Sequence, residues 1–196
     1  MNPDLFRSCK LAVPWVSQMD NKLPNDCGHA CDLMLLKYAG LGEGLTVEDL
    51  FYCGVGNPGY TTQEHLVDIA AHYGLECERL RDFQLIELPY YLVNARPVIV
   101  LVDYAHLPFP PHLRTRDQGS HWIVIVGFDS EYFYAHDPLW LPDQLGGDYG
   151  AGGRRHPIHA SCLYSAMDAT RLRLGVVPAQ GAIEKDQRPR EGQEDQ

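Results

Sequence analysis

The stretch Asn25-Asp26-Cys27-Gly28-His29-Ala30-Cys31 decides how this sequence is interpreted, because a loop ends there and a helix begins. The residues from Ala30 to Ala39 are mostly apolar and run into Gly40, so they predict a buried helix stopped by a glycine. Cys27 falls on the first turn, at the positive end of the helix dipole, where a thiolate is favoured. A thiolate attacks carbonyl carbons, so Cys27 is a candidate nucleophile. A buried structural thiol is the alternative.

A histidine and an aspartate farther along the chain suit a nucleophilic cysteine. The segment Ser120–Phe128 is almost entirely apolar and predicts a central strand buried on both faces, with His121 at its entrance. A second predicted strand, Tyr132–His136, is followed at once by Asp137. Two neighbouring antiparallel strands would place His121 beside Asp137. The order Cys, His, Asp along the chain is that of a papain-type triad.

Gln18 completes a possible catalytic set. It lies shortly before Cys27, and a glutamine amide donates hydrogen bonds without carrying charge, which suits an oxyanion hole. His136 is the nearest rival to His121 as a general base, because it abuts Asp137. Neighbouring residues on a strand point to opposite faces, so His136 should face away if Asp137 faces the site. A turn-capping role is the alternative for Asp137.

With these residues in view, the sequence resembles the C39-like peptidase family. These are papain-fold cysteine peptidases related to the bacteriocin-processing domains of peptide exporters. The resemblance spans roughly residues 13–177, with its motifs in the family's order. It is carried by four segments, Val13–Gly40, Arg96–Val102, His121–Phe128 and Ala135–Pro138.

The resemblance implies an α+β, papain-like fold in which an N-terminal helical part, carrying the nucleophile helix, packs on an antiparallel β-sheet. It implies Cys27 as nucleophile, His121 as base, Asp137 as orienting acid and Gln18 as oxyanion donor. No metal or organic cofactor is implied, and the expected activity is that of a thiol hydrolase acting on a peptide or protein substrate.

The sequence also departs from the family pattern. His29 stands where related sequences often carry proline or an apolar residue, and the segment from Tyr104 to Ser120 is long and rich in proline. No exporter membrane domain follows, so the family's leader-peptide specificity does not carry over. The candidate substrate-binding residues are His29, Trp122, Arg114 and Arg116. A solvated first-turn side chain for His29 and an exposed charged loop for the two arginines are the alternatives.

Composition narrows the class of protein. The chain has 196 residues, a formal net charge of −10 and a pI near 5.2, which argues against nucleic acid as a partner. No segment approaches the ~20 apolar residues of a membrane span, and the N-terminus lacks a secretory core. The six cysteines are scattered, so we expect a cytoplasmic protein with mostly buried thiols. The oligomeric state stays open.

The chain divides into a lead-in (residues 1–12), one peptidase domain (13–177) and a disordered, charged tail (178–196). Within the domain, Thr46 and Thr62 are expected to cap helices, and Asp82 to cap a third whose Pro89 either kinks it or marks its first turn. Further strands are expected at 76–80, 97–103 and 171–177, a loop at 139–157 and a short helix at 159–167.

Three other functions remain as alternatives. An acyltransferase or amide-forming enzyme would use the same thioester chemistry with an amine in place of water. A non-catalytic module would bind a peptide on the same frame. A nucleotide cyclase ranks last, because no glycine loop leads into a helix with a phosphate-binding lysine. A metal site from His156, His159 and Cys162 is disfavoured by their spacing.

Overall fold

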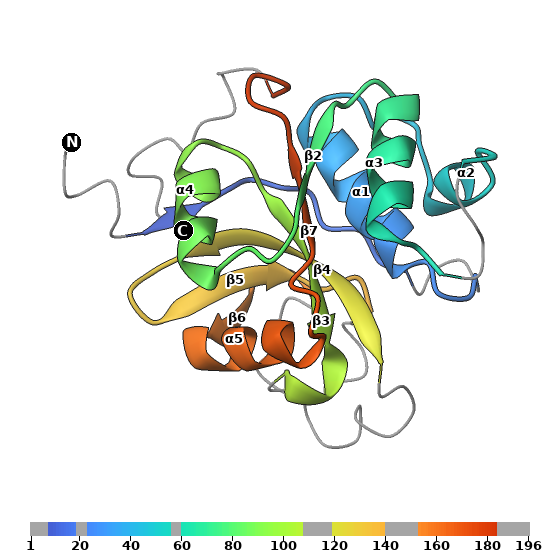
Figure 1. The fold of residues 1–196 in the computed structure, drawn as a ribbon. Helices are drawn as coiled ribbons and strands as arrows, with labels where there is room; N and C mark the ends of the chain where they lie inside the picture. Colours follow the sequence, from blue (N-terminus) through green and yellow to red (C-terminus); the bar gives the residue numbers. More distant parts are fainter. Residues whose placement is uncertain (1–7, 19–22, 56–59, 108–118, 140–152, 184–196) are drawn as a thin grey trace.

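The computed structural model describes residues 8–18, 23–55, 60–107, 119–139 and 153–183, which form a mixed helical and antiparallel β structure (Figure 1). The α-helices, in chain order, are α1 (Cys27–Tyr38), α2 (Val47–Phe51), α3 (Gln63–His72), α4 (Leu88–Val93) and α5 (Ala160–Ala169), with short 3₁₀ helices η2 (Leu85–Glu87) and η3 (Tyr104–His106). The strands are β1 (Cys9–Lys10), β2 (Cys77–Leu80), β3 (Val98–Asp103), β4 (Ser120–Phe128), β5 (Tyr132–His136), β6 (His156–His159) and β7 (Gly175–Pro178).

The described strands form one antiparallel sheet in the order β2-β7-β3-β4-β5-β6, and β1 also pairs with β4. Figure 1 shows α1, α2 and α3 gathered on the right of the view, while β5, β6, α4 and α5 lie on the left. Helix α1 contacts β4, and α5 contacts β3 and β6. The expected arrangement of an N-terminal helical part packed on an antiparallel sheet is therefore confirmed.

Helix α1 lies inside the protein. All of its residues except Cys27 and Lys37 are buried, as its apolar composition on every side requires. Its first turn approaches the start of α3 so closely that a Cβ on Gly28 would lie 2.6 Å from a Thr61 methyl carbon. Glycine at this position lets the helix end pack tightly, and it fixes where the neighbouring Cys27 emerges.

Strand β4 is the central strand of the site. It pairs with β3 on one side, where His121 faces Val102, and with β5 on the other. Its residues from His121 to Phe128 are buried, in agreement with the apolar run that predicted a central strand. The register with β5 shifts between Ile125 and Gly127, a local bulge.

Most local signals in the sequence have their expected outcome. Thr46 and Thr62 each make a complete capping box, with Asp49 and His65 as their partners. Pro89 occupies the first turn of α4, the second of the two roles considered for it. A local backbone–side-chain exchange of this kind needs no tertiary contact, which explains why the sequence reveals it.

Four expectations on the elements are wrong. Asp82 does not cap a helix, because its φ of 52° is left-handed and Gln84 caps η2 instead. The strand expected from Arg171 begins only at Gly175, since Arg171 and Arg173 also have positive φ. Strand β6 starts inside the expected loop, and β1 lies in the expected lead-in. Both are short strands whose pairing with β5 or β4 comes from distant residues.

Candidate active site

The predicted histidine and aspartate meet at one end of the sheet. His121 Nε2 lies 2.9 Å from Asp137 Oδ1, and both side chains are buried. The Cys27 side chain lies close enough to the same imidazole to help raise the pKa of His121. Because Nε2 is engaged by the carboxylate, the ring offers Nδ1 to the thiol. Residues from α1, β4 and the end of β5 thus come together around His121, and Cys27 is the partly exposed member.

The electrostatics of the histidine are set by this contact. Burial disfavours a charged ring, but the charge and hydrogen bond of Asp137, with those of Cys27 added, raise the pKa of His121 to about 10. An imidazolium is therefore the stable form of His121 at neutral pH. The ring therefore lies between the Asp137 carboxylate and the Cys27 side chain, which is on the first turn of α1.

Gln18 lies beside the aspartate in space. Its backbone N–H donates to the Pro138 carbonyl at 2.9 Å, so the segment that carries Gln18 runs along the residue that follows Asp137. The side-chain Oε1 is buried and makes no hydrogen bond to any residue that the structure describes. The oxygen end of the amide is thus not used to hold the fold.

His136 faces away from the site, as the alternation of a strand predicts. Its Nε2 lies 2.8 Å from the Val13 carbonyl, and its Nδ1 accepts the backbone N–H of Arg155 at 2.9 Å. One nitrogen must donate and the other accept, which is the neutral tautomer. Burial, with the charges of Arg155 and Arg154, lowers the pKa of His136 to about 4. The rival general base is a structural residue.

Of the four candidate substrate-binding residues, the structure describes His29 and Trp122, and both contact Thr61. His29 is buried against Phe51 and lies 3.4 Å from the Thr61 hydroxyl, so the alternative of a solvated first-turn side chain is wrong. Burial and the nearby His65 lower the pKa of His29 to about 4. Trp122 is also buried, and its indole N–H donates to the Thr61 carbonyl. Arg114 and Arg116 lie outside the described residues.

Asp26 and Cys31, two neighbours of Cys27, have different surroundings. Asp26 occupies the N-cap position of α1, but its side chain makes no capping hydrogen bond. Cys31 is buried in the core, with its Sγ 3.3 Å from the Trp122 carbonyl. All six cysteines are free thiols, and Cys9 and Cys31 are buried while the other four are partly exposed. The expectation of mostly buried thiols is therefore only partly met.

Neither a metal site nor a membrane span stands out in the described part of the chain. There, no group of three or more His, Cys, Asp or Glu side chains gathers to hold a metal ion. No helix among those residues has the length and apolar character that crossing a membrane requires.

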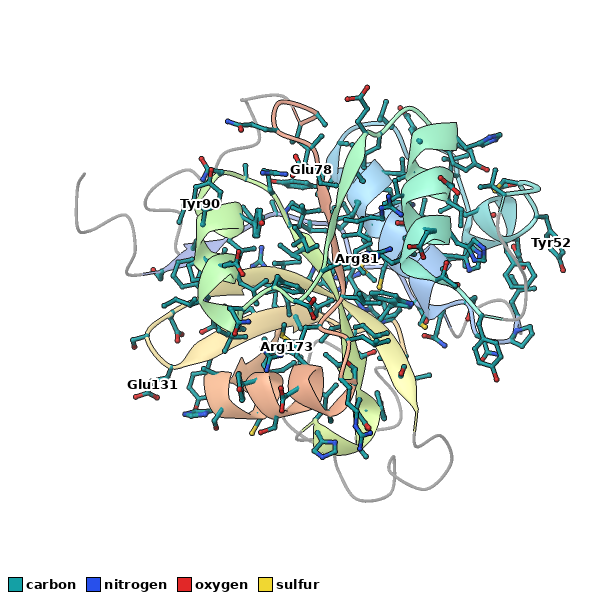
Figure 2. The ribbon with its side chains drawn as sticks, viewed as in Figure 1. Tyr52, Glu78, Arg81, Tyr90, Glu131 and Arg173 are labelled. Atoms are coloured by element: carbon teal, nitrogen blue, oxygen red, sulfur yellow. The ribbon has the colours of Figure 1, made fainter. Side chains whose placement is uncertain are left out.

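A groove of about 730 Å³ lies apart from these residues, between η2, α4, the β4–β5 turn and α5. Tyr90 and Glu131, both on its lining, stand on the left of the molecule in Figure 2. Phe128, also on its lining, ends β4, and His121 lies near the start of that strand. Seven residues of extended chain separate the two by roughly 23 Å, so the groove is not part of the candidate site.

The sequence model of the peptidase C39-like family matches residues 10–144, more than half of the chain. This chain belongs to the C39-like peptidase family. The matched region contains all four candidate catalytic residues of the C39-like domain, Gln18, Cys27, His121 and Asp137. No curated protein sequence gives a significant match to the chain.

Solved structures of C39-like proteins have the same fold. A protein described as a C39-like peptidase from Bacillus anthracis has a TM-score of 0.58 at 17% identity, covering 88% of this chain and 98% of its own. The peptidase domain of Streptococcus ComA, a bifunctional ABC transporter of a quorum-sensing pathway, has a TM-score of 0.53 at 18% identity, covering 86% and 99%. A double-glycine motif protease from an AMS/PCAT transporter, solved with a leader peptide, has a TM-score of 0.52 at 20% identity, covering 87% and 94%.

At these identities the likeness shows the fold, which is papain-like with mixed helix and antiparallel sheet. The family and the fold together support a cysteine peptidase. A partly exposed thiol in contact with a charged imidazole, itself held by a buried carboxylate, can perform nucleophilic attack followed by proton transfer.

Proposed function

We propose that this protein is a cysteine peptidase that cleaves a peptide or related amide, with Cys27 as nucleophile, His121 as acid and base, Asp137 as orienting acid and Gln18 as oxyanion donor. The single observation that carries the proposal is the buried His121–Asp137 hydrogen bond, on an imidazole whose pKa the Cys27 side chain also raises. A histidine with only a structural role can use both ring nitrogens to bind the backbone, as His136 does.

In the first half of the reaction, the Cys27 thiolate attacks the carbonyl carbon of the scissile amide and the carbonyl oxygen becomes an oxyanion. The backbone N–H of Cys27 has no partner within α1, because it belongs to the first turn. This N–H and the Gln18 side chain donate to the oxyanion, a stabilisation of about 3–4 kcal/mol per donor. His121 then gives its proton to the departing amine, and a thioester remains.

In the second half, neutral His121 takes a proton from water, and the hydroxide attacks the thioester carbon. The C–S bond breaks, the acid product leaves, and the thiolate–imidazolium pair is restored. Asp137 keeps the ring in one orientation throughout, since it accepts from Nε2 and leaves Nδ1 toward sulfur. The steps require only side chains of this chain and water.

Digestion of a mixed peptide library tests this proposal. We expect new termini to appear with the wild-type protein and the rate to fall by about 10⁶ in Cys27→Ala, since the nucleophile itself is lost. Cys162→Ala is the matched control, because it removes another partly exposed free thiol on α5. Cleavage by Cys27→Ala at the wild-type rate would contradict the proposal.

The same digestion separates the rival functions. An acyltransferase would transfer the acyl group to an added amine, and mass analysis would find the amide in place of the free acid. A binding module would retain peptides without cleaving them. We further propose that the protein acts in the cytoplasm, where free cysteines persist, and fractionation of cells producing it would test this.

A further inference from the structure

Asp137 lies just beyond the regular part of the sheet. The last pair in the β4–β5 ladder joins Val124 to His136, so the ladder does not hold the next residue, Asp137. An aspartate that must keep an imidazole in place therefore needs other partners for its backbone. The structure supplies them from two segments outside β4 and β5.

The backbone of Asp137 is held from both sides. Its N–H donates to the Gly153 carbonyl at 2.8 Å, and its carbonyl accepts the indole N–H of Trp15 at 2.9 Å. The carboxylate is held as well, because Oδ1 accepts both the His121 ring and the backbone N–H of Leu139. Little freedom remains for the residue to turn its carboxylate away from His121.

The Gly153 contact is unusually close. A Cβ at residue 153 would lie 1.8 Å from the Asp137 carbonyl oxygen and 2.8 Å from Trp15 Nε1. Any side chain larger than hydrogen would thus displace the carbonyl from the indole that binds it. The Trp15 ring is itself covered by the Arg154 guanidinium, 5.6 Å from the ring centre.

Trp15 also belongs to a segment, residues 13–18, that runs alongside residues 136–138 at the end of β5. The Val13 carbonyl lies against His136, the Trp15 indole binds Asp137, and the Gln18 N–H binds Pro138. These three hydrogen bonds align residues 13–18 with residues 136–138. The segment that carries the proposed oxyanion donor is therefore fastened to the residue that orients the proposed base.

We propose that Trp15 and Gly153 are positioning residues: Trp15 binds the Asp137 carbonyl and Gly153 accepts its N–H, and together they keep the acid and Gln18 in a fixed relation to His121. This inference rests on the proposed function for its effect on catalysis, but its structural content concerns the His121–Asp137 pair alone. We call the two hydrogen bonds from Trp15 and Gly153 to the Asp137 backbone the clamp. Displacing a catalytic group by about 1 Å costs roughly 10²-fold in rate, so loosening the clamp should slow the reaction measurably.

The test uses Trp15→Phe and Gly153→Ala, read by NMR titration of His121 and by steady-state kinetics. We expect each variant to lower the pKa of His121 by at least about one unit and to lower kcat by roughly 10- to 100-fold, with KM changed less than about threefold. A role in folding alone would lower stability and leave the titration of His121 in place.

Two matched controls isolate the clamp. Trp122→Phe also removes an indole–carbonyl hydrogen bond, but one made to Thr61 rather than Asp137. Gly119→Ala adds a Cβ where nothing lies within 4 Å. We expect both to keep the pKa of His121 near the wild-type value, whatever they do to stability.

The outcomes separate the inference from the proposed function. If the wild type cleaves no peptide but Trp15→Phe and Gly153→Ala still lower the pKa of His121, the clamp stands and the peptidase proposal fails. If the wild type cleaves peptides and both variants titrate like the wild type, the clamp is wrong. Should Gly153→Ala fail to fold, Trp15→Phe decides alone.

Discussion

Two buried histidines on neighbouring strands of one sheet have opposite charge states. His121, on β4, contacts the Asp137 carboxylate and the Cys27 side chain, and these raise its pKa to about 10. His136, on β5, lies between a backbone carbonyl and a backbone N–H, and burial lowers its pKa to about 4. Their exposed fractions, 6% and 2%, are almost the same.

Burial therefore does not decide which histidine can work as an acid and base. It disfavours charge on both rings, and the neighbouring groups determine whether that effect is overcome. A carboxylate on Nε2 stabilises the imidazolium of His121, whereas the N–H that Arg155 presents to His136 requires a neutral ring. Changing those partners should therefore change the charge state of each histidine separately.

The largest expected effect comes from Asp137→Asn, which removes the charge that distinguishes His121 from His136. We expect the pKa of His121 to fall by several units and kcat to fall by about 10⁴, as in a comparable triad. NMR titration and steady-state kinetics measure the two. Asp129→Asn is the matched control at the far end of β4 and β5, and an equal loss there would contradict the account.

A smaller effect is expected from His136→Gln, which disturbs the neutral site. Losing the hydrogen bonds to Val13 and Arg155 should lower the free energy of unfolding by about 1–3 kcal/mol, while the pKa of His121 changes by less than about one unit. Chemical denaturation and NMR titration report the two quantities. His72→Gln, at an exposed position on α3, controls for the substitution itself. A fall in the pKa of His121 by more than about one unit would show that the two histidines are not independent.

The pH dependence of stability should differ in sign between the two sites. His136 stays neutral in the folded protein, so its contribution is present above pH 6.5 and is lost as the pH falls toward 4. The contribution of His121 is fully present below pH 6.5 and is lost as the pH rises through about 10. Each site should give a slope of about 1.4 kcal/mol per pH unit in its own window.

Unfolding free energies measured from pH 4 to 10 check this pattern. In His136→Gln, the slope of the unfolding free energy against pH should be smaller at acid pH by the share of one proton. In Asp137→Asn, the slope at alkaline pH should be smaller instead. The buried His29 contributes to the acid slope in both variants, since its pKa is also lowered. Unchanged slopes in both variants would contradict the assigned charge states.

The smallest effect concerns a third buried group, Asp32. Among the described residues, it has neither a charged partner like that of His121 nor backbone hydrogen bonds like those of His136. It lies on α1 with no exposure, and neither carboxylate oxygen has a hydrogen-bond partner among the described residues. Burial raises its pKa well above the ordinary value. Its stabilising contribution is thus present at low pH and lost as the pH rises.

Asp32→Asn removes that loss, and we expect it to stabilise the protein at pH 8 by about 1 kcal/mol, with a smaller gain at pH 5. Denaturation at the two pH values measures it, and Asp68→Asn on the exposed side of α3 is the control. A destabilised Asp32→Asn protein would mean that the carboxylate has a partner that this account omits.

The sequence predicts the parts of the site that depend on local pattern. Cys27 is found by the loop-to-helix junction, and His121 and Asp137 by two adjacent strands whose pairing brings them together. The alternation of β5 also predicts that His136 faces away. Each of these follows from spacing within one element or one hairpin.

Features that depend on distant packing could not be predicted. His29 looks exposed on a first turn, but Phe51 and Thr61 cover it from elsewhere in the chain. The sequence around Trp15 and Gly153 does not reveal their contacts with Asp137. Trp15 is more than a hundred residues away from Asp137 in the chain. Gly153 is separated from Asp137 by a long connection.

The rate at which iodoacetamide alkylates Cys27 tests the central claim most directly, because it measures the contact between sulfur and imidazole without knowledge of the substrate. Between pH 5 and 9, we expect Cys27 to react at least about tenfold faster than the other partly exposed cysteines, and to lose most of that advantage in His121→Asn. A Cys27 that stays silent across this range, or that reacts equally fast without His121, would contradict the account.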